Sequence, residues 1–190
     1  MTDSFYSANL FGRDFTFHTD ESSFSPTTPD KGTLAMLSVL SLKKGQKVLD
    51  LGCSYGLVGI SVASIVGDDK VFMSDIHEAS LSCARKNIER NHVSGIQIVK
   101  SDAFSEIEEK DFDLILSNPP YHADFSVPKA FLEKGFNKLC VGGSFFMVTK
   151  RKDWYKNKFI SLFGGVRIHE IDGYYIFEGQ KREMSYRNKK

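Results

Sequence analysis

Residues 48–60 read Val-Leu-Asp-Leu-Gly-Cys-Ser-Tyr-Gly-Leu-Val-Gly-Ile, and this stretch decides the fold. An apolar segment reaches an acid at Asp50, small residues follow, and the apolar residues then resume at helical spacing. The pattern predicts a strand, a tight turn and a helix. Gly52 and Gly56 let the backbone of such a turn approach a ligand, and the free amides at the start of the helix favour a carboxylate or phosphate. We therefore interpret the turn as a nucleotide-cofactor site.

The turn departs from the dinucleotide fingerprint G-x-G-x-x-G, which would place glycine where this chain has Ser54. A serine is tolerated at this position if its φ is negative. A second acid supports a cofactor site, because Asp75 ends the next apolar segment, where a carboxylate can accept hydrogen bonds from ribose hydroxyls.

The composition is that of a soluble globular protein. The chain has 190 residues, enough for one α/β domain and too few for two ordinary ones, with 41% hydrophobic and 26% charged residues. No run of about eighteen apolar residues suggests a membrane span, and no secretory signal is apparent, so we expect a cytoplasmic protein without membrane contact. The three cysteines have no paired spacing, so no metal site is predicted.

After the first strand, the chain alternates between helix and strand patterns. The predicted elements are a helix at 57–66, a strand at 70–74, a helix at 78–91 and strands at 95–99 and 112–116. This alternation predicts a parallel sheet, which binds ligands at the carboxyl ends of its strands. Asp50, Asp75, Asp102 and Asn118 all fall at such ends, so we expect them to converge on one ligand.

The flanking segments are predicted from shorter signals. Residues 10–17 alternate aromatic and polar side chains and predict a short strand, and a helix is expected from the start signals at 27–30 to Lys44-Gly45. Beyond Pro128 we expect a helix at 129–139, a strand at 144–149, a helix at 153–163 and apolar strands at 166–171 and 174–177. Asp172-Gly173 between the last two strands signals a hairpin, so the sheet should end in an antiparallel edge.

A second motif, Asn118-Pro119-Pro120-Tyr121, follows the strand at 112–116. The prolines remove backbone donors and leave the Asn118 side chain and the Pro119 carbonyl free to accept both hydrogens of a planar amine or amide. Tyr121 would stack on the ring that carries the amine. Because the two acceptors favour tetrahedral geometry at nitrogen, they would free its lone pair to attack a methyl sulfonium in line.

The two motifs together with Asp75 and Asp102 resemble the class I S-adenosylmethionine-dependent methyltransferases. Phe24-Ser25-Pro26, the segment Asp30-Lys31-Gly32-Thr33 and His122 resemble more narrowly the small-domain branch that includes ribosomal RNA guanine-N2 methyltransferases. The resemblance implies an α/β, Rossmann-like fold of about seven mostly parallel strands, with an antiparallel C-terminal hairpin and helices on both faces. It implies one domain over residues 1–190, with an N-terminal flap at 1–26 and the Rossmann-like core at 27–190.

The resemblance also assigns roles to residues. Asp50 and the turn would hold the methionine end of S-adenosylmethionine, Asp75 the ribose and Asp102 the adenine amino group. The predicted cofactor-binding residues are Asp50, Gly52, Cys53, Ser54, Gly56, Asp75, Ile76, Asp102, Ala103 and Asn118. The predicted catalytic residues, which hold the acceptor, are Asn118, Pro119, Pro120 and Tyr121. Cys53 is expected to be a small buried residue without a chemical role, and His122 and Phe125 are candidates for contact with the acceptor.

The leading hypothesis is methylation of the exocyclic N2 amine of a guanine in ribosomal RNA, with the base unpaired or flipped. Basic residues outnumber acids from Lys150 onward, which indicates either a solvated surface or an RNA-facing patch. Asn-Pro-Pro-Tyr is also typical of glutamine-N5 protein methyltransferases and adenine-N6 nucleic-acid methyltransferases, which are the alternatives. A nicotinamide-dependent oxidoreductase or a nucleotide-binding protein without methyltransferase activity agrees less well with the broken glycine pattern and the second motif.

Overall fold

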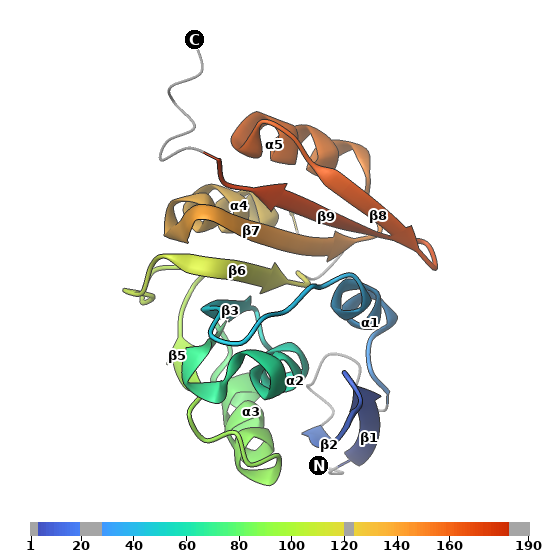
Figure 1. Ribbon diagram of the computed structural model, residues 1–190, viewed down its shortest axis with the longest axis vertical. Helices are drawn as coiled ribbons and strands as arrows, with labels where there is room; N and C mark the ends of the chain where they lie inside the picture. Colours follow the sequence, from blue (N-terminus) through green and yellow to red (C-terminus); the bar gives the residue numbers. More distant parts are fainter. Residues whose placement is uncertain (1–3, 20–27, 120–123, 183–190) are drawn as a thin grey trace.

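A seven-stranded sheet runs through the computed structural model, with the strand order β5-β4-β3-β6-β7-β9-β8 (Figure 1). The structure describes residues 4–19, 28–119 and 124–182. The strands are β3 (Val48–Leu51), β4 (Val71–Asp75), β5 (Gln97–Lys100), β6 (Phe112–Ser117), β7 (Leu139–Thr149), β8 (Arg167–Ile171) and β9 (Tyr174–Gln180). The first five run parallel, whereas β9 runs antiparallel to both β7 and β8. The predicted mixed sheet and its antiparallel hairpin at Asp172-Gly173 are confirmed.

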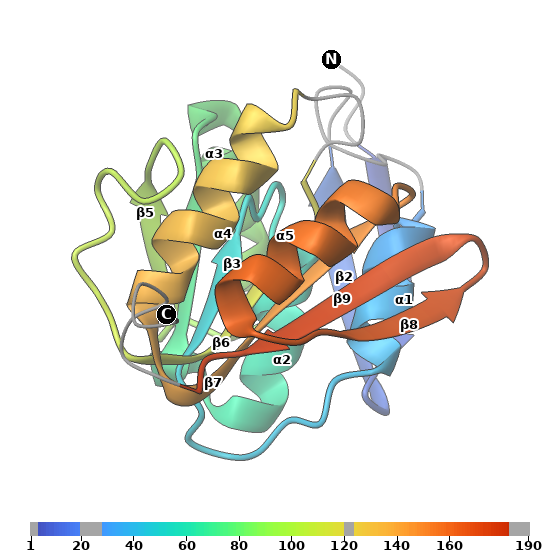
Figure 2. The ribbon, with the colours of Figure 1, turned by 90° about the horizontal axis from the view of Figure 1, so that it is seen from above.

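Helices cover both faces of this sheet, as predicted, because neighbouring residues of a strand point to opposite faces. The helices are α1 (Lys31–Ser38), α2 (Leu57–Val66), α3 (Glu78–Arg90), α4 (Ser126–Lys138) and α5 (Asp153–Phe163). Val48 of β3 packs in a core with α1, α2 and α3, whereas Leu49 packs in a second core with α4 and α5. Figure 2 shows α4 and α5 lying side by side in front of the sheet. Among the described residues, no helix is long and apolar enough to cross a membrane.

The N-terminal region differs from the prediction of one short strand. It forms a hairpin of β1 (Ser4–Leu10) and β2 (Arg13–Thr19). Phe11 and Gly12 connect the strands with φ of 53° and 74°, and positive φ at both loop residues matches the right-handed twist of a hairpin. Phe15 and Phe17 of β2 are buried in the core that contains α3. The predicted segment 10–17 therefore crosses the turn instead of forming one strand.

Several other boundaries also differ from the prediction. α1 ends at Ser38 instead of near Lys44, because the following Leu40 and Leu42 pack against the core from a loop. α4 begins at Ser126, with Pro128 in its first turn, where the missing N–H has no helical partner to lose. β7 begins at Leu139 and includes Gly142-Gly143, which were predicted to lie in a connection. Gly142 has a φ of 90°, and the β6–β7 register shifts here, so the strand continues through an irregularity.

Candidate active site

The carboxyl ends of β3, β4, β5 and β6 open into a cavity of about 400 Å³. Asp50, Asp75, Asp102 and Asn118, one from each strand end, all line it, so the structure brings together the four polar residues that the sequence placed at one edge. The other predicted site residues in its lining are Gly52, Cys53, Ser54, Ile76, Ala103 and Pro119. Val127 and Phe131 of α4 form an apolar part of the wall.

Some predicted site residues have other positions. Gly56 does not line the cavity; a Cβ on it would lie 2.8 Å from Met73 Cε, so this glycine permits the close packing of the turn on β4. Pro120, Tyr121 and His122 lie outside the described residues, as do Phe24, Ser25 and Pro26. Phe125 is absent from the lining and stacks on Trp154, with ring centroids 4.6 Å apart.

The turn after β3 is built from backbone hydrogen bonds. The amides of Gly52 and Cys53 donate to the carbonyl of Ser74, at 2.8 and 2.9 Å. Ser54 has a φ of 51°, so the negative φ at which a serine would be tolerated without strain is not the one it adopts. The left-handed conformation directs the Ser54 amide to Asp75 Oδ2, at 2.9 Å, which ties the turn to the end of β4.

Asp50 stabilises the start of α2. Gly56, the N-cap residue, has no side chain to cap the helix, and Asp50 Oδ2 instead accepts a hydrogen bond from the amide of Gly59 at 2.8 Å. Burial raises the pKa of Asp50 to about 7; the Gly59 amide opposes this rise, and the charge of Asp75 adds a smaller increase. A cation bound in the cavity would favour the ionised form of this carboxyl.

The Asp75 carboxylate holds two backbone amides beside the cavity, one in the turn after β3 and one directly after β4. Its Oδ2 accepts from Ser54 and its Oδ1 accepts from the amide of His77 at 2.9 Å. A carboxylate has about four acceptor positions, so two remain for hydroxyl donors of a ligand. Asp102 and Ile76 are exposed beside it, and Ile76 has half of its surface accessible, which leaves an apolar face for a planar ring.

Asn118 is held by two residues, Asp30 and Thr33, that the sequence analysis did not place in the site. Its Nδ2 donates to Asp30 Oδ2 and to Thr33 Oγ1, both at 2.8 Å. Its Oδ1 is buried, and no described residue donates a hydrogen bond to it. Asp30 and Thr33 also line the cavity. The only sequence signals for them were the helix start and the family resemblance, neither of which predicts contact across 88 residues.

Tyr55 is a further cavity residue that the sequence analysis missed. Its hydroxyl lies 2.6 Å from the hydroxyl of Tyr6, which connects the cofactor turn to β1. Burial raises the pKa of Tyr55 to about 12 and also raises the pKa of Tyr6, so both phenols stay protonated at neutral pH. Burial also raises the pKa of the Cys53 thiol, so the thiol stays protonated at neutral pH. In the described ranges, no three His, Cys, Asp or Glu side chains are grouped to hold a metal ion.

A family model described as methyltransferase small domain matches residues 14–178. The chain belongs to the methyltransferase small domain family. This membership confirms the predicted family and the predicted enzyme class, a methyltransferase, and the fold of the chain is the one shared by solved methyltransferases.

Two sequence relatives illustrate the range of similarity within the family. A Bacillus subtilis protein, YbxB, described as uncharacterized, is 31% identical over 182 residues, which cover 93% of this chain and 90% of that protein. The ribosomal RNA small subunit methyltransferase C of Haemophilus influenzae is 44% identical over 99 residues, 52% of this chain and 29% of that protein.

A solved structure is similar over nearly the whole chain. The T. thermophilus 16S rRNA N2 G1207 methyltransferase, in complex with AdoMet and guanosine, has a TM-score of 0.87 and 28% identity. The similarity covers 95% of this chain and 51% of that chain. The chain thus spans about half the length of this protein and under a third of the H. influenzae protein.

Proposed function

We propose that this chain transfers a methyl group from S-adenosylmethionine to the exocyclic N2 amine of a guanine in ribosomal RNA. The observation that carries the proposal is the buried Asn118 Oδ1, an acceptor without a described donor, in the same cavity as the Asp50 and Asp75 turn. A buried carbonyl oxygen without a partner is costly, so a donor from a ligand accounts for its position. An exocyclic amine supplies such a donor.

The methyl donor of this family is S-adenosylmethionine, which contributes an electrophilic methyl sulfonium. The cavity has the size and mixed polarity of a small-molecule site. We assign the methionine end to Asp50 and the turn at Gly52–Ser54, the ribose hydroxyls to Asp75, and the adenine to Asp102, Ala103 and Ile76. In this arrangement the ionised Asp50 faces the positively charged end of the cofactor, and the free acceptor positions of Asp75 receive the hydroxyl hydrogens.

The acceptor amine is assigned to the second motif. Asn118 Oδ1 would accept one hydrogen of the NH2 group and the Pro119 carbonyl the other, which turns the nitrogen lone pair toward the methyl group. Positive charge develops on the nitrogen during transfer, and the two carbonyl dipoles stabilise that charge. We retain Tyr121 as the stacking residue and Pro120 as the residue that stiffens the motif; both roles rest on the sequence.

RNA is favoured as the substrate by a basic segment, Lys150–Lys152, that follows β7 directly. Because β6 and β7 are parallel, this segment and Asn118 follow strands that end at the same sheet edge. Each cation lies over an aromatic ring, at distances of 5.0, 5.0 and 4.9 Å from the ring centroids of Tyr174, Phe125 and Tyr175. The rings support the long side chains, and all three residues are exposed to solvent, where a phosphate backbone could reach them. Lys152 also forms an exposed ion pair with Glu170, at 3.5 Å.

We also propose that the chain forms a single cytoplasmic domain in which residues 1–26 act as a flap on the core at 27–190. The hairpin β1–β2 shares the core of α1, α2 and α3, which supports one folding unit. Ribosomal RNA as the acceptor implies the cytoplasm.

The test is transfer of labelled methyl from S-adenosylmethionine to deproteinised ribosomal RNA, intact ribosomal subunits and a protein extract, all from cells lacking this gene. Label in N2-methylguanosine supports the proposal, whereas label in glutamine or N6-methyladenosine assigns the chain to another branch of the family. For the control variant Asn118→Ala, we expect turnover to fall at least about a hundredfold with nearly unchanged cofactor affinity, because its contact strengthens in the transition state. Lost cofactor binding in this variant would contradict the assignment of Asn118 to the acceptor.

A further inference from the structure

A side-chain amide can turn over by half a rotation and exchange its oxygen and nitrogen, so the orientation of Asn118 determines what the cavity offers to a ligand. With Oδ1 toward the acceptor, the site binds an NH2 group. With Nδ2 in that position, the site would favour a carbonyl or a ring nitrogen and would repel an amine. The chemistry proposed above therefore depends on something that fixes the amide.

Asp30 discriminates between the two orientations. Its Oδ2 accepts from Asn118 Nδ2 at 2.8 Å and from the amide of Thr33 at 2.7 Å. An ionised carboxylate only accepts hydrogen bonds, so a rotated Asn118 would place its oxygen against an oxygen and lose this contact. Thr33 Oγ1 provides the second acceptor for Nδ2, at 2.8 Å. Thr33 alone would not discriminate, because a hydroxyl can donate as well as accept.

The two partners are themselves fixed in place. Asp30 is the N-cap residue of α1, and its bond to Thr33 holds its carboxylate at the first turn of that helix. α1 in turn packs on the sheet through the buried Ala35, Met36 and Leu37. The position of the carboxylate relative to Asn118 is therefore set by the packing of a helix and not by a mobile surface side chain.

We propose that Asp30 and Thr33 are positioning residues that lock the Asn118 amide with Oδ1 toward the methyl acceptor, so that the site selects an NH2 donor. This inference rests on the proposed function for its catalytic consequence. The structural part, that Asp30 and Thr33 hold the Asn118 amide, does not depend on the proposed function. It predicts that both Nδ2 hydrogens are hydrogen-bonded in the protein without any substrate.

The structural part is tested by NMR of the Asn118 side-chain amide, assigned by the loss of its signals in Asn118→Ala. We expect both Nδ2 hydrogens to exchange at least about tenfold more slowly than those of an exposed asparagine, and Asp30→Ala and Thr33→Val to abolish this protection. Unprotected Nδ2 hydrogens in the wild-type protein would overturn the inference, whatever acceptor the enzyme uses.

The catalytic part is tested by a double-mutant cycle. We expect Asp30→Ala to lower kcat by about 10- to 30-fold and Thr33→Val by about 3- to 10-fold, with the cofactor Kd within about twofold of wild type. Thr33→Ser keeps the hydroxyl acceptor in place and should stay within about threefold of the wild-type kcat. Asp30→Asn can donate as well as accept, so it no longer discriminates between the two orientations of Asn118 and should lower kcat nearly as far as Asp30→Ala. Because Asp30 acts through Asn118, the double variant Asp30→Ala/Asn118→Ala should be no slower than Asn118→Ala alone.

Two results would overturn the positioning role: a normal kcat in Asp30→Ala, or losses that multiply in the double variant, which would indicate an independent effect on folding or binding. If the wild-type enzyme methylates glutamine instead of RNA, the same cycle is measured with that acceptor. The failure of the proposed function and the failure of the lock are then distinguishable.

Discussion

Asp50 is a buried acid that caps a helix and lines the cofactor cavity, and its pKa of about 7 makes the stability of the protein depend on pH. Because the pKa is raised, the folded state retains a proton that the unfolded chain loses near its ordinary pKa of about 4. The stabilisation is fully present below that value and is lost as the pH rises toward 7. We expect the free energy of unfolding of the wild type to fall by up to about 1.4 kcal/mol per pH unit in this window.

The comparison variant is Asp50→Asn, which keeps an oxygen for the Gly59 amide and cannot ionise. Its free energy of unfolding, measured by urea denaturation between pH 4.5 and 8, should lack this decline. Parallel pH profiles for the two proteins would show that Asp50 titrates normally in the folded state.

Ser54 occupies a left-handed conformation that glycine adopts without strain, and its contact to Asp75 uses only the backbone amide. We therefore expect Ser54→Gly to raise the free energy of unfolding by about 0.5–1 kcal/mol and to leave cofactor affinity unchanged. Ser54→Val should lower it by more than about 1 kcal/mol, since a β-branched side chain is strained at this φ. A stability loss in Ser54→Gly, measured by chemical denaturation, would mean that the serine hydroxyl is needed.

At the scale of single residues, the sequence predicts part of the site. The position of four polar residues at strand ends follows from the alternation of strands and helices, and the structure brings all four to one cavity. The φ of Ser54 could not be predicted, because it depends on a hydrogen bond to the neighbouring strand. The contact of Asn118 with Asp30 could not be predicted either, since it joins segments 88 residues apart.

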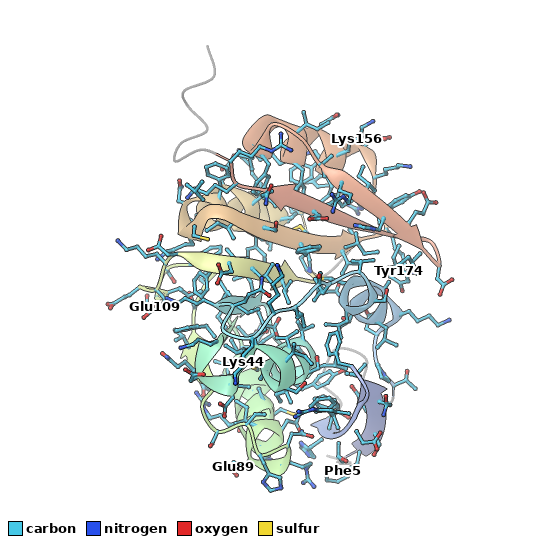
Figure 3. All side chains as sticks on the ribbon, viewed as in Figure 1. Phe5, Lys44, Glu89, Glu109, Lys156 and Tyr174 are labelled. Carbon is cyan, nitrogen blue, oxygen red and sulfur yellow. The ribbon has the colours of Figure 1, made fainter. Side chains whose placement is uncertain are left out.

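At the scale of elements, the hairpin β1–β2 is attached to α3 by asparagine side chains that replace a neighbouring strand. Asn87 Oδ1 accepts from the amide of His18 at 2.7 Å, and its Nδ2 donates to the carbonyls of His18 and Tyr55, both at 2.9 Å. Asn91, one turn later, makes the same pair of contacts with Thr16. Figure 3 shows Phe5 of β1 and Glu89 of α3 at the end of the molecule opposite Lys156 of α5.

We expect Asn87→Ala to lower the free energy of unfolding by about 2–3 kcal/mol, because it removes three hydrogen bonds to buried backbone groups of β2 and the cofactor turn. Hydrogen exchange at residues 15–18 should accelerate more than exchange in β3 and β6, since the hairpin loses its attachment to α3. Asn91→Ala, at a less buried position, is the milder control. Uniform acceleration across the protein would show that the hairpin does not detach locally.

Helices and strands were predictable where the apolar residues follow a single helical or strand spacing. The bounds of α2 and α5 agree with their helical spacing, and the final hairpin agrees with its Asp-Gly turn. The first hairpin was missed because its turn, Phe11-Gly12, interrupts an alternation of aromatic and polar residues that reads as continuous. The start of β7 was missed because Gly142-Gly143 resembles a connection. The strand is extended by the pairing of Leu139 with Phe112 of β6 and by backbone hydrogen bonds of Gly142 and Gly143 with Lys181.

At the scale of the whole molecule, the parallel sheet places the cavity and the basic segment Lys150–Lys152 at one edge. Lys43 and Lys44 precede β3 and therefore belong to the opposite edge. We expect replacement of all three basic-segment residues by glutamine to raise the KM for ribosomal RNA at least about tenfold, with an unchanged Kd for the cofactor. The logarithm of the RNA association constant should fall less steeply with the logarithm of salt concentration. Each lost phosphate contact should reduce the magnitude of this slope by about 0.7–0.9.

The control is Lys43→Gln/Lys44→Gln, which removes two charges from the other edge and should leave the KM for RNA near the wild-type value. Equal effects of the two replacements would indicate that net charge, and not this surface, controls RNA binding.

The fold and the family were predictable from the order and spacing of the motifs along the chain. The acceptor is a finer question, because the same four-residue motif suits a base amine or a glutamine amide and two of its residues, Pro120 and Tyr121, lie outside the described structure.

The most direct test of the central claim is nucleoside analysis by mass spectrometry of ribosomal RNA from cells with and without the gene. We expect one N2-methylguanosine to disappear on deletion, to return with the wild-type gene, and not to return with Asn118→Ala at equal protein level. Unchanged N2-methylguanosine in the deletion strain, with a methylated glutamine or adenine lost instead, would contradict the proposed guanine-N2 activity.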